Sequence, residues 1–224
     1  MGKEYINIAE ISSLRSYSKR LLLFDDFLYS NYRIVDGTGV GFGATRETTY
    51  PMTSGQDLVI NSRVAGAAID DECQVDFPAI ATPESIITCF VDFLFPAAFG
   101  AELSSFVYGA FWKGYTIIAG FRYDRANLVW QYYDSAGSWT NVSATTMQFT
   151  TLNYSRLQFS VNLDTHKYLL ASVDDEEYSV QDLYCYKTLA GANQSSYFTI
   201  LIKAVTAVRQ IIVIGKVGVW NGLL

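Results

Sequence analysis

The sequence is short of basic runs and of long apolar segments, and each shortage excludes a class of function. Sixteen Lys and Arg against 22 Asp and Glu give a net charge of −6, and no basic run extends beyond Lys19-Arg20. Recognition of a nucleic-acid backbone needs a basic footprint, so we exclude nucleic acid as a partner. No segment reaches about 18 consecutive apolar residues, so we expect no membrane span.

Histidine and cysteine are too sparse for the common catalytic and metal sites. His166 is the only histidine, so any Ser-His-Asp or Cys-His triad would have to use it. It lies in the turn-prone run Asp164–Lys167, which predicts a hairpin tip rather than a catalytic base. Cys73, Cys89 and Cys185 form no closely spaced pair for zinc. Their number favours a reduced compartment, and a disulfide between two of them stays open.

The N-terminal run MGKEYINIAEISS has no apolar stretch followed by a small-residue cleavage site. We therefore expect no signal peptide. This predicts a chain made in the cytoplasm, with a virion or other extracellular assembly as one destination. Residues 1–20 differ in pattern from the rest, and we expect them to form an N-terminal arm before a single domain spanning residues 21–224.

Charged residues are scarce, at 17%, whereas hydrophobic residues make up 50% and aromatic residues 15%. Ordinary domains carry charge on about a quarter of their residues. This shortage leaves apolar surface to be covered. Either a partner subunit covers it or a thick core takes it up, and composition alone leaves both interpretations open.

The clearest pattern lies between Tyr154 and Tyr186. Leu157, Phe159 and Val161 alternate with polar neighbours, a period of two that is typical of strands. Turn-prone residues break the pattern twice, which predicts an antiparallel meander. In its middle strand we expect two faces, with Tyr168, Leu170 and Ser172 on one and Leu169, Ala171 and Val173 on the other.

Similar alternation continues along the chain and predicts about a dozen short strands. Lys113-Gly114 fits a tight hairpin turn. The nearly continuous apolar run 85–95 predicts an inner strand covered on both faces. Alternate glycines between 37 and 43 predict either a flat strand face or an irregular loop. The other expected strands are 21–28, 55–61, 69–77, 105–112, 115–123, 128–133, 138–142, 198–205 and 211–220. This spacing predicts an all-β antiparallel jelly-roll sandwich of two stacked sheets.

Three features resemble the concanavalin A-like jelly-roll superfamily, which includes laminin-G domains, legume lectins and glucanases. They are the early Phe24-Asp25-Asp26-Phe27 strand, the late meander ending at Val173-Asp174, and the final strand 211–220, expected beside the first. The resemblance covers residues 21–224. It implies two curved sheets whose concave face often holds carbohydrate, and it leaves the function open.

Glucanases of this superfamily carry alternating carboxylates on one strand, spaced for retaining hydrolysis. Here Asp70 and Glu72 alternate, but position 74 is Gln, and the run 174–177 is contiguous within a turn. We therefore predict no catalytic residues. The resemblance also allows calcium, for which the oxygen ligands would be Asp25, Asp26, Asp36 or Asp174-Asp175. We expect no other cofactor.

Carbohydrate binding needs flat aromatic faces next to planar polar groups, because sugars combine apolar faces with hydroxyl rims. Such residues cluster in the middle of the chain, and the alternative is that the aromatic ones fill the core. The candidates are Trp112, Tyr115, Arg122, Asp124, Trp130, Tyr132 and Trp139.

The leading expectation is a non-catalytic structural or interaction protein of a symmetric assembly, such as a virion decoration, capsid-associated or tail component. Self-association or other subunits of the assembly would cover the apolar surface. The first alternative is a glycan-binding module that uses the concave sheet face. The second is a glycoside hydrolase or lyase with an unrecognised carboxylate pair.

Overall fold

The computed structural model describes residues 21–25, 33–38, 42–47, 57–61, 70–78, 84–96, 102–142, 149, 153–190, 196–205 and 211–223. The expected N-terminal arm, residues 1–20, lies outside these ranges. In the described residues the chain forms sixteen strands and no helix. No helix that could cross a membrane occurs among them.

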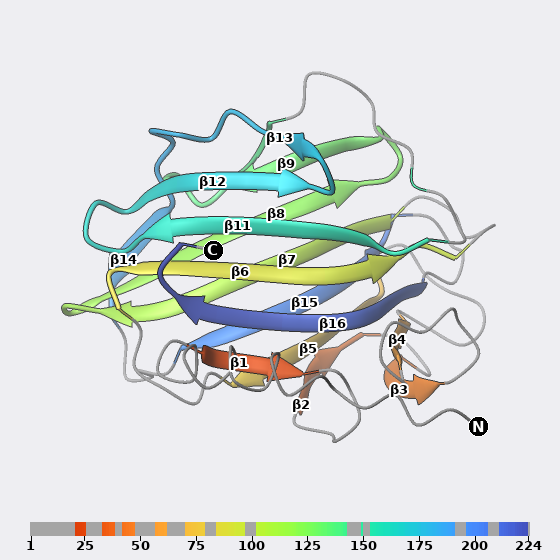
Figure 1. Cartoon of the computed structure of the whole chain (residues 1–224). Helices are drawn as coiled ribbons and strands as arrows, with labels where there is room; N and C mark the ends of the chain where they lie inside the picture. The colour runs from red at the N-terminus through yellow and green to blue at the C-terminus, as the bar shows by residue number, and fades with distance from the viewer. Residues whose placement is uncertain are drawn as a thin grey trace, which may run out of the picture.

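The strands form two antiparallel sheets of eight strands each, stacked face to face (Figure 1). In the first sheet the order is β13-β12-β11-β6-β16-β4-β3, and β1 also pairs with β16. Its strands are β1 (Leu21–Asp25), β3 (Gly43–Glu47), β4 (Asp57–Asn61), β6 (Ile86–Leu94), β11 (Ser155–Asn162), β12 (Lys167–Val173), β13 (Glu176–Glu177) and β16 (Ile211–Asn221).

In the second sheet the order is β10-β9-β8-β7-β15-β5-β2, and β14 also pairs with β8. Its strands are β2 (Arg33–Gly37), β5 (Glu72–Pro78), β7 (Glu102–Trp112), β8 (Tyr115–Asp124), β9 (Val129–Tyr133), β10 (Trp139–Asn141), β14 (Tyr186–Leu189) and β15 (Tyr197–Ala204). The predicted jelly-roll sandwich is confirmed, as is the return of the last strand beside the first.

Aromatic side chains from both sheets fill the space between the layers. Phe93 of the first sheet lies 5.5 Å from Phe106 and 5.9 Å from Trp130 of the second, centroid to centroid. Phe121 and Phe159 meet across the same space at 5.3 Å. Burying large aromatic rings is the main favourable term in such a core. Since period-two alternation sends every second residue inward, this core follows directly from the sequence pattern.

Strand β6 confirms the expectation of a strand covered on both faces. It lies between β11 and β16, and eight of its nine residues are buried. Within it, Asp92 accepts hydrogen bonds from Nε and Nη2 of Arg156, at 2.6 and 2.8 Å. This bidentate pair satisfies a carboxylate that would otherwise be buried without a partner.

The middle strand of the predicted meander departs from simple alternation. Val161 pairs with Tyr168 and Ser160 with Leu170, so Leu169 is an extra residue opposite no direct partner. This β-bulge shifts the alternation by one position. As a result Tyr168, Ala171 and Val173 are buried together, whereas we expected Tyr168 opposite the other two. A bulge depends on the partner strand, which the local pattern does not reveal.

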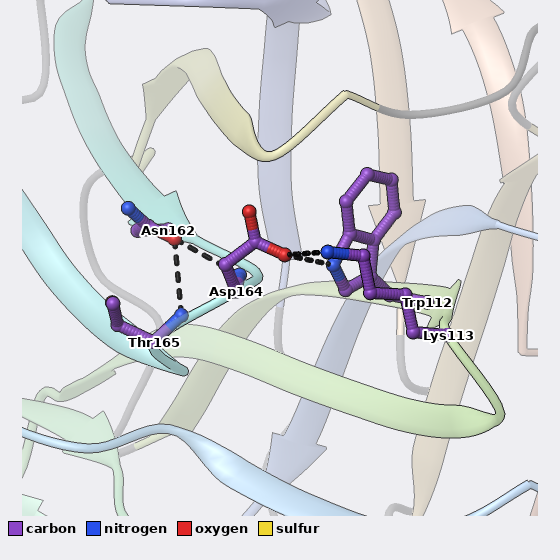
Figure 2. A network of polar contacts seen from close by, with 5 residues as sticks. All are labelled: Trp112, Lys113, Asn162, Asp164 and Thr165. Atoms are coloured by element: carbon purple, nitrogen blue, oxygen red, sulfur yellow. Dashed lines mark hydrogen bonds and ion pairs between the residues drawn. The ribbon is translucent and has the colours of Figure 1, made fainter.

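Side-chain hydrogen bonds link two hairpin turns, the one between β7 and β8 and the one between β11 and β12 (Figure 2). Asp164, in the turn between β11 and β12, accepts hydrogen bonds from Trp112 Nε1 at 2.9 Å and Lys113 Nζ at 2.6 Å. Lys113 and Gly114 both have positive φ, 48° and 87°, as a two-residue type I′ turn requires. The predicted tight turn is therefore confirmed, and it places the two tips side by side.

Candidate functional site

A shallow groove of about 380 Å³ lies on the outer face of the second sheet. The inner face of this sheet packs into the core, so alternate residues of each strand point outward into the groove. Its floor and walls come from β5, β7, β8, β9, β10 and β15. The lining residues are Gln74, Leu103, Ser105, Val107, Ile118, Arg122, Tyr133, Trp139, Tyr197, Thr199, Leu201 and Lys203.

Strand register sets these side chains in rows across the sheet. One row runs from Gln74 through Leu201 and Ser105 to Arg122 and then Gln131. Residues directly opposite each other on neighbouring strands lie close enough for their side chains to touch. The row therefore has polar groups at both ends and apolar or small residues in the middle.

Aromatic rings lie at two sides of the groove. Tyr133 and Trp139 are a cross-strand pair of β9 and β10, with ring centroids 5.0 Å apart. On the other side, the ring of Tyr197 lies over Gly109 of β7, where a Cβ atom would collide with it. Glycine at position 109 thus lets the Tyr197 ring lie flat on the sheet.

Arg122 is the best-anchored polar side chain in the groove. Its guanidinium lies 4.7 Å from the ring centroid of Trp139, and its Nε donates to Gln131 Oε1 at 2.8 Å. Gln131 Nε2 in turn donates to Asn141 Oδ1 at 2.9 Å. Partial burial lowers the pKa of Arg122, while the nearby charge of Asp124 raises it. Arginine stays protonated under all ordinary conditions.

A second polar cluster lies on the β5 and β15 side, where Gln74 and Thr199 line the groove and Asp76 lies beside them. Asp76 Oδ1 accepts hydrogen bonds from Thr199 Oγ1 at 2.5 Å and from Gln74 Nε2 at 3.0 Å. Both donors come from the same outward face of β5 and β15. Two donors on one carboxylate oxygen hold it in a fixed orientation, so this side of the groove is also preorganised.

The alternating carboxylates of β5 differ from the expected pair. Asp70 lies before the strand with a φ of 73°, so it is not in the alternating set. The outward positions of β5 are Glu72, Gln74 and Asp76, all half-buried. Carboxylates therefore occupy the first and third of these positions, separated by Gln. From the sequence we paired Asp70 with Glu72, whereas the carboxylates that share the outward face of β5 are Glu72 and Asp76.

The structure brings together two of the seven predicted site residues, Arg122 and Trp139. Asp124 shares the outward face of β8 with Arg122 but accepts bonds from the backbone and side chain of Asn127, at 3.2 and 2.8 Å. It therefore stabilises the turn after β8 rather than lining the groove.

The other four predicted residues lie elsewhere. Trp130 is fully buried in the core, and Tyr132 packs against the core. Both side chains point inward because they lie two residues apart on β9. Trp112 and Tyr115 lie at the β7–β8 hairpin end. For Trp130 and Tyr132 the core-filling alternative holds.

Sequence reasoning missed the contribution of β15. Its residues Tyr197, Thr199, Leu201 and Lys203 alternate along one outward face and all line the groove. The alternation was visible in the sequence. Their neighbours were not, because β15 lies between β7 and β5, strands more than 80 residues earlier in the chain.

A calcium site finds no support in the described ranges, where no group of three His, Cys, Asp or Glu is arranged to hold a metal. Of the proposed ligands, Asp174 accepts a hydrogen bond from the backbone N–H of Arg156 at 2.7 Å. Asp26 lies outside the described residues. Cys73, Cys89 and Cys185 are all buried and free, and burial raises the pKa of the Cys73 thiol to about 11.

No protein-family model matches the chain, and no curated protein matches it in sequence. Solved structures do share its fold. The carbohydrate esterase of the Shiga toxin-encoding bacteriophage phi24B aligns with a TM-score of 0.60 and 13% identity, over 90% of this chain and 99% of that chain.

Two further structures align equally widely. The Bacillus licheniformis β-glucanase gives a TM-score of 0.54 and 12% identity, over 90% of this chain and 98% of that chain. A Bacillus subtilis protein of unknown function with a galectin-like fold gives 0.54 and 11%, over 90% and 96%. The chain therefore has the concanavalin A-like jelly-roll fold. At such low identity the likeness concerns the fold alone.

Proposed function

We propose that this jelly-roll protein binds glycans in the groove on the outer face of its second sheet. The observation that carries the proposal is the lining of that groove. The rings of Tyr133, Trp139 and Tyr197 lie beside two sets of polar side chains, Arg122 on one side and Gln74 with Thr199 on the other.

This arrangement suits the chemistry of sugars. A pyranose ring has apolar C–H faces, which pack on aromatic rings, and a rim of hydroxyls, which need planar donors and acceptors. The groove volume of about 380 Å³ is at the small end of the range typical of ligand sites. The names of two proteins with this fold, a carbohydrate esterase and a β-glucanase, support the same class of ligand.

Binding is tested by titrating a broad glycan panel and following the heat of binding by calorimetry. We expect one glycan class to bind the unmodified protein, and Tyr133→Ala to weaken that binding at least about tenfold, because an anchoring ring in a groove contributes more than about 1.4 kcal/mol. Tyr184→Ala is the matched control. Tyr184 is 50% exposed and does not line the groove, so its removal should leave affinity unchanged.

Absence of binding across the panel would reject the proposal, and so would equal losses in the two tyrosine variants. Far-UV circular dichroism and thermal unfolding of both variants establish that each is folded, so that a loss of binding reports on the groove.

A subunit of a symmetric assembly is the second candidate function. The observation that favours it is the exposure of large apolar side chains on the segment 184–189, where Tyr184 is 50% and Leu189 76% exposed. Exposed apolar side chains of this kind are a common feature of protein–protein contact sites. The two functions are compatible, because this segment lies outside the groove lining.

A glycoside hydrolase or lyase is the third candidate. It would use Glu72 and Asp76, which face the same side of β5. Their Cα atoms lie about 13 Å apart, from a rise of about 3.3 Å per residue. The two carboxyl groups would have the separation of an inverting pair only if both side chains extended toward each other. The glycan panel also tests this candidate when the products are analysed for cleavage.

A further inference from the structure

Arg122 carries a positive charge into the groove without a carboxylate to neutralise it. In the described part of the chain, no Asp or Glu oxygen lies within ion-pair distance of its guanidinium, and its hydrogen-bond acceptor is the neutral amide oxygen of Gln131. Partial burial already opposes the charge and lowers the pKa of Arg122. A half-buried cation of this kind gains stability when an anion binds it.

The contacts of the guanidinium leave a defined binding edge. Nε and one N–H of Nη2 are both directed to Gln131 Oε1. A guanidinium has five N–H donors in a planar fork, so the Nη1 and Nη2 N–H groups at its far end remain for a ligand. Two parallel donors at that edge match the two oxygens of a carboxylate.

Other charged groups in or beside the groove already have partners of their own. Lys203 pairs with Asp70 at 3.0 Å, and Asp76 accepts bonds from Thr199 and Gln74. Asp124 accepts bonds from Asn127, so it acts on Arg122 only at longer range. Of the two charged side chains that line the groove, Arg122 and Lys203, Arg122 is therefore the one without a carboxylate partner.

We propose that the groove selects acidic glycans, and that a carboxylate on the sugar ring binds the free edge of Arg122 while the ring packs on neighbouring aromatic side chains. This inference rests on the proposed glycan-binding function. The net charge of −6 repels polyanions in general, so a preference for acidic sugars would have to come from this local contact.

The test compares each acidic oligosaccharide with its own methyl ester, which keeps the sugar ring and removes the charge. The panel contains oligogalacturonate, oligoglucuronate and alginate oligosaccharides, with sulfated galactan to separate carboxylate from sulfate recognition. We expect at least one acid to bind about tenfold or more tightly than its ester, a difference of about 1.4 kcal/mol. Raising the salt concentration should reduce this preference.

Two variants locate the effect. Arg122→Gln should abolish the preference for the acid while binding to the methyl ester persists. Lys187→Gln is the matched control, because Lys187 is an exposed cation of β14 that does not line the groove, and it should keep the preference.

Three results would overturn the inference. Esters binding as well as their acids, a preference that survives Arg122→Gln, or tighter binding of sulfated galactan than of every carboxylate would each do so. In those cases glycan binding itself stands. If no glycan of either kind binds the unmodified protein, both the inference and the proposed function fail.

Discussion

At the scale of single residues, paired polar side chains fix which residues of neighbouring strands lie opposite each other. Arg156 bonds twice to Asp92 within the first sheet, and Thr88 and Ser160 share a buried hydrogen bond of 2.8 Å. The buried members, Asp92, Thr88 and Ser160, would each be costly to bury without a partner. Their pairing fixes the register of strands whose apolar residues alone would allow slippage.

Asp57 is a buried carboxyl at the start of β4, with no side-chain exposure. Burial raises its pKa, and the Tyr154 hydroxyl offsets this in part. A folded-state pKa above the unfolded value of 3.8 means that the folded state binds the proton more tightly. Stability contributed by this group therefore falls as pH rises from 3.8 through the folded pKa.

We accordingly predict that Asp57→Asn stabilises the protein at pH 7, because the amide removes the cost of burying an ionised carboxylate. The gain should disappear below pH 3.8, where both states carry a protonated carboxyl. Urea unfolding of both proteins from pH 3 to pH 7 measures it. Asp175→Asn, in an exposed turn, is the control, and a gain that does not depend on pH would contradict the argument.

At the scale of elements, the hydroxyl of Tyr168 joins the two sheets beneath the groove. From β12 it accepts a hydrogen bond from the Gly120 N–H and donates to the Tyr133 carbonyl, each at 2.9 Å. Pairing between β8 and β9 ends one residue earlier, at Phe121 and Tyr132. The hydroxyl thus lies where the next ladder bond would form. Beyond this point, β14 takes the edge of β8.

We predict that Tyr168→Phe destabilises the protein by about 1–3 kcal/mol, because it leaves a buried N–H and a buried carbonyl without a partner. It should also weaken glycan binding, since Tyr133 is held at its backbone by this contact. Urea unfolding and faster hydrogen exchange of the Gly120 amide measure the effect. Tyr184→Phe, at an exposed position, is the control. An unchanged unfolding midpoint would show that β8 and β9 pair without the hydroxyl.

At the scale of the whole molecule, one face of each sheet is covered by the other, and the outer faces differ. The outer face of the second sheet carries the groove. Apolar residues on the outer face of the first sheet, including Val59, Leu94 and Val213, form a second, separate buried cluster. The low content of charged residues therefore reflects a large buried interior. The apolar residues that stay exposed are the ones that an assembly contact would cover.

If the protein is a subunit of a symmetric assembly, sedimentation velocity should show a defined oligomer at micromolar concentration. We predict that Leu189→Glu shifts this species to monomer, because a charge at a 76% exposed apolar residue would be buried unpaired in the contact. Ser179→Glu, in another exposed segment, should leave it unchanged. A monomer at high concentration in the unmodified protein would remove the second candidate function.

How far the sequence predicts the site can be judged from Arg122 and Tyr197. Arg122 was predicted because it lies on an alternating strand next to aromatic residues, all within a local run of hairpins. Tyr197 was not, since nothing near it in the sequence reveals that β15 inserts between β7 and β5. Trp130 was named as a candidate binding residue, with core filling as the alternative, and it lies in the core because it shares the inward face of β9 with the partly buried Tyr132.

The sequence by itself determined most of the strands, the tight turns and the jelly-roll class, because alternation and turn chemistry act over a few neighbouring residues. Only the tertiary structure decided which outward faces adjoin, where the bulge at Leu169 reverses the alternation, and that the Tyr168 hydroxyl enters the edge of the other sheet. These features depend on strand order and on contacts between distant segments. The local pattern of apolar and polar residues does not specify which distant segments become neighbours.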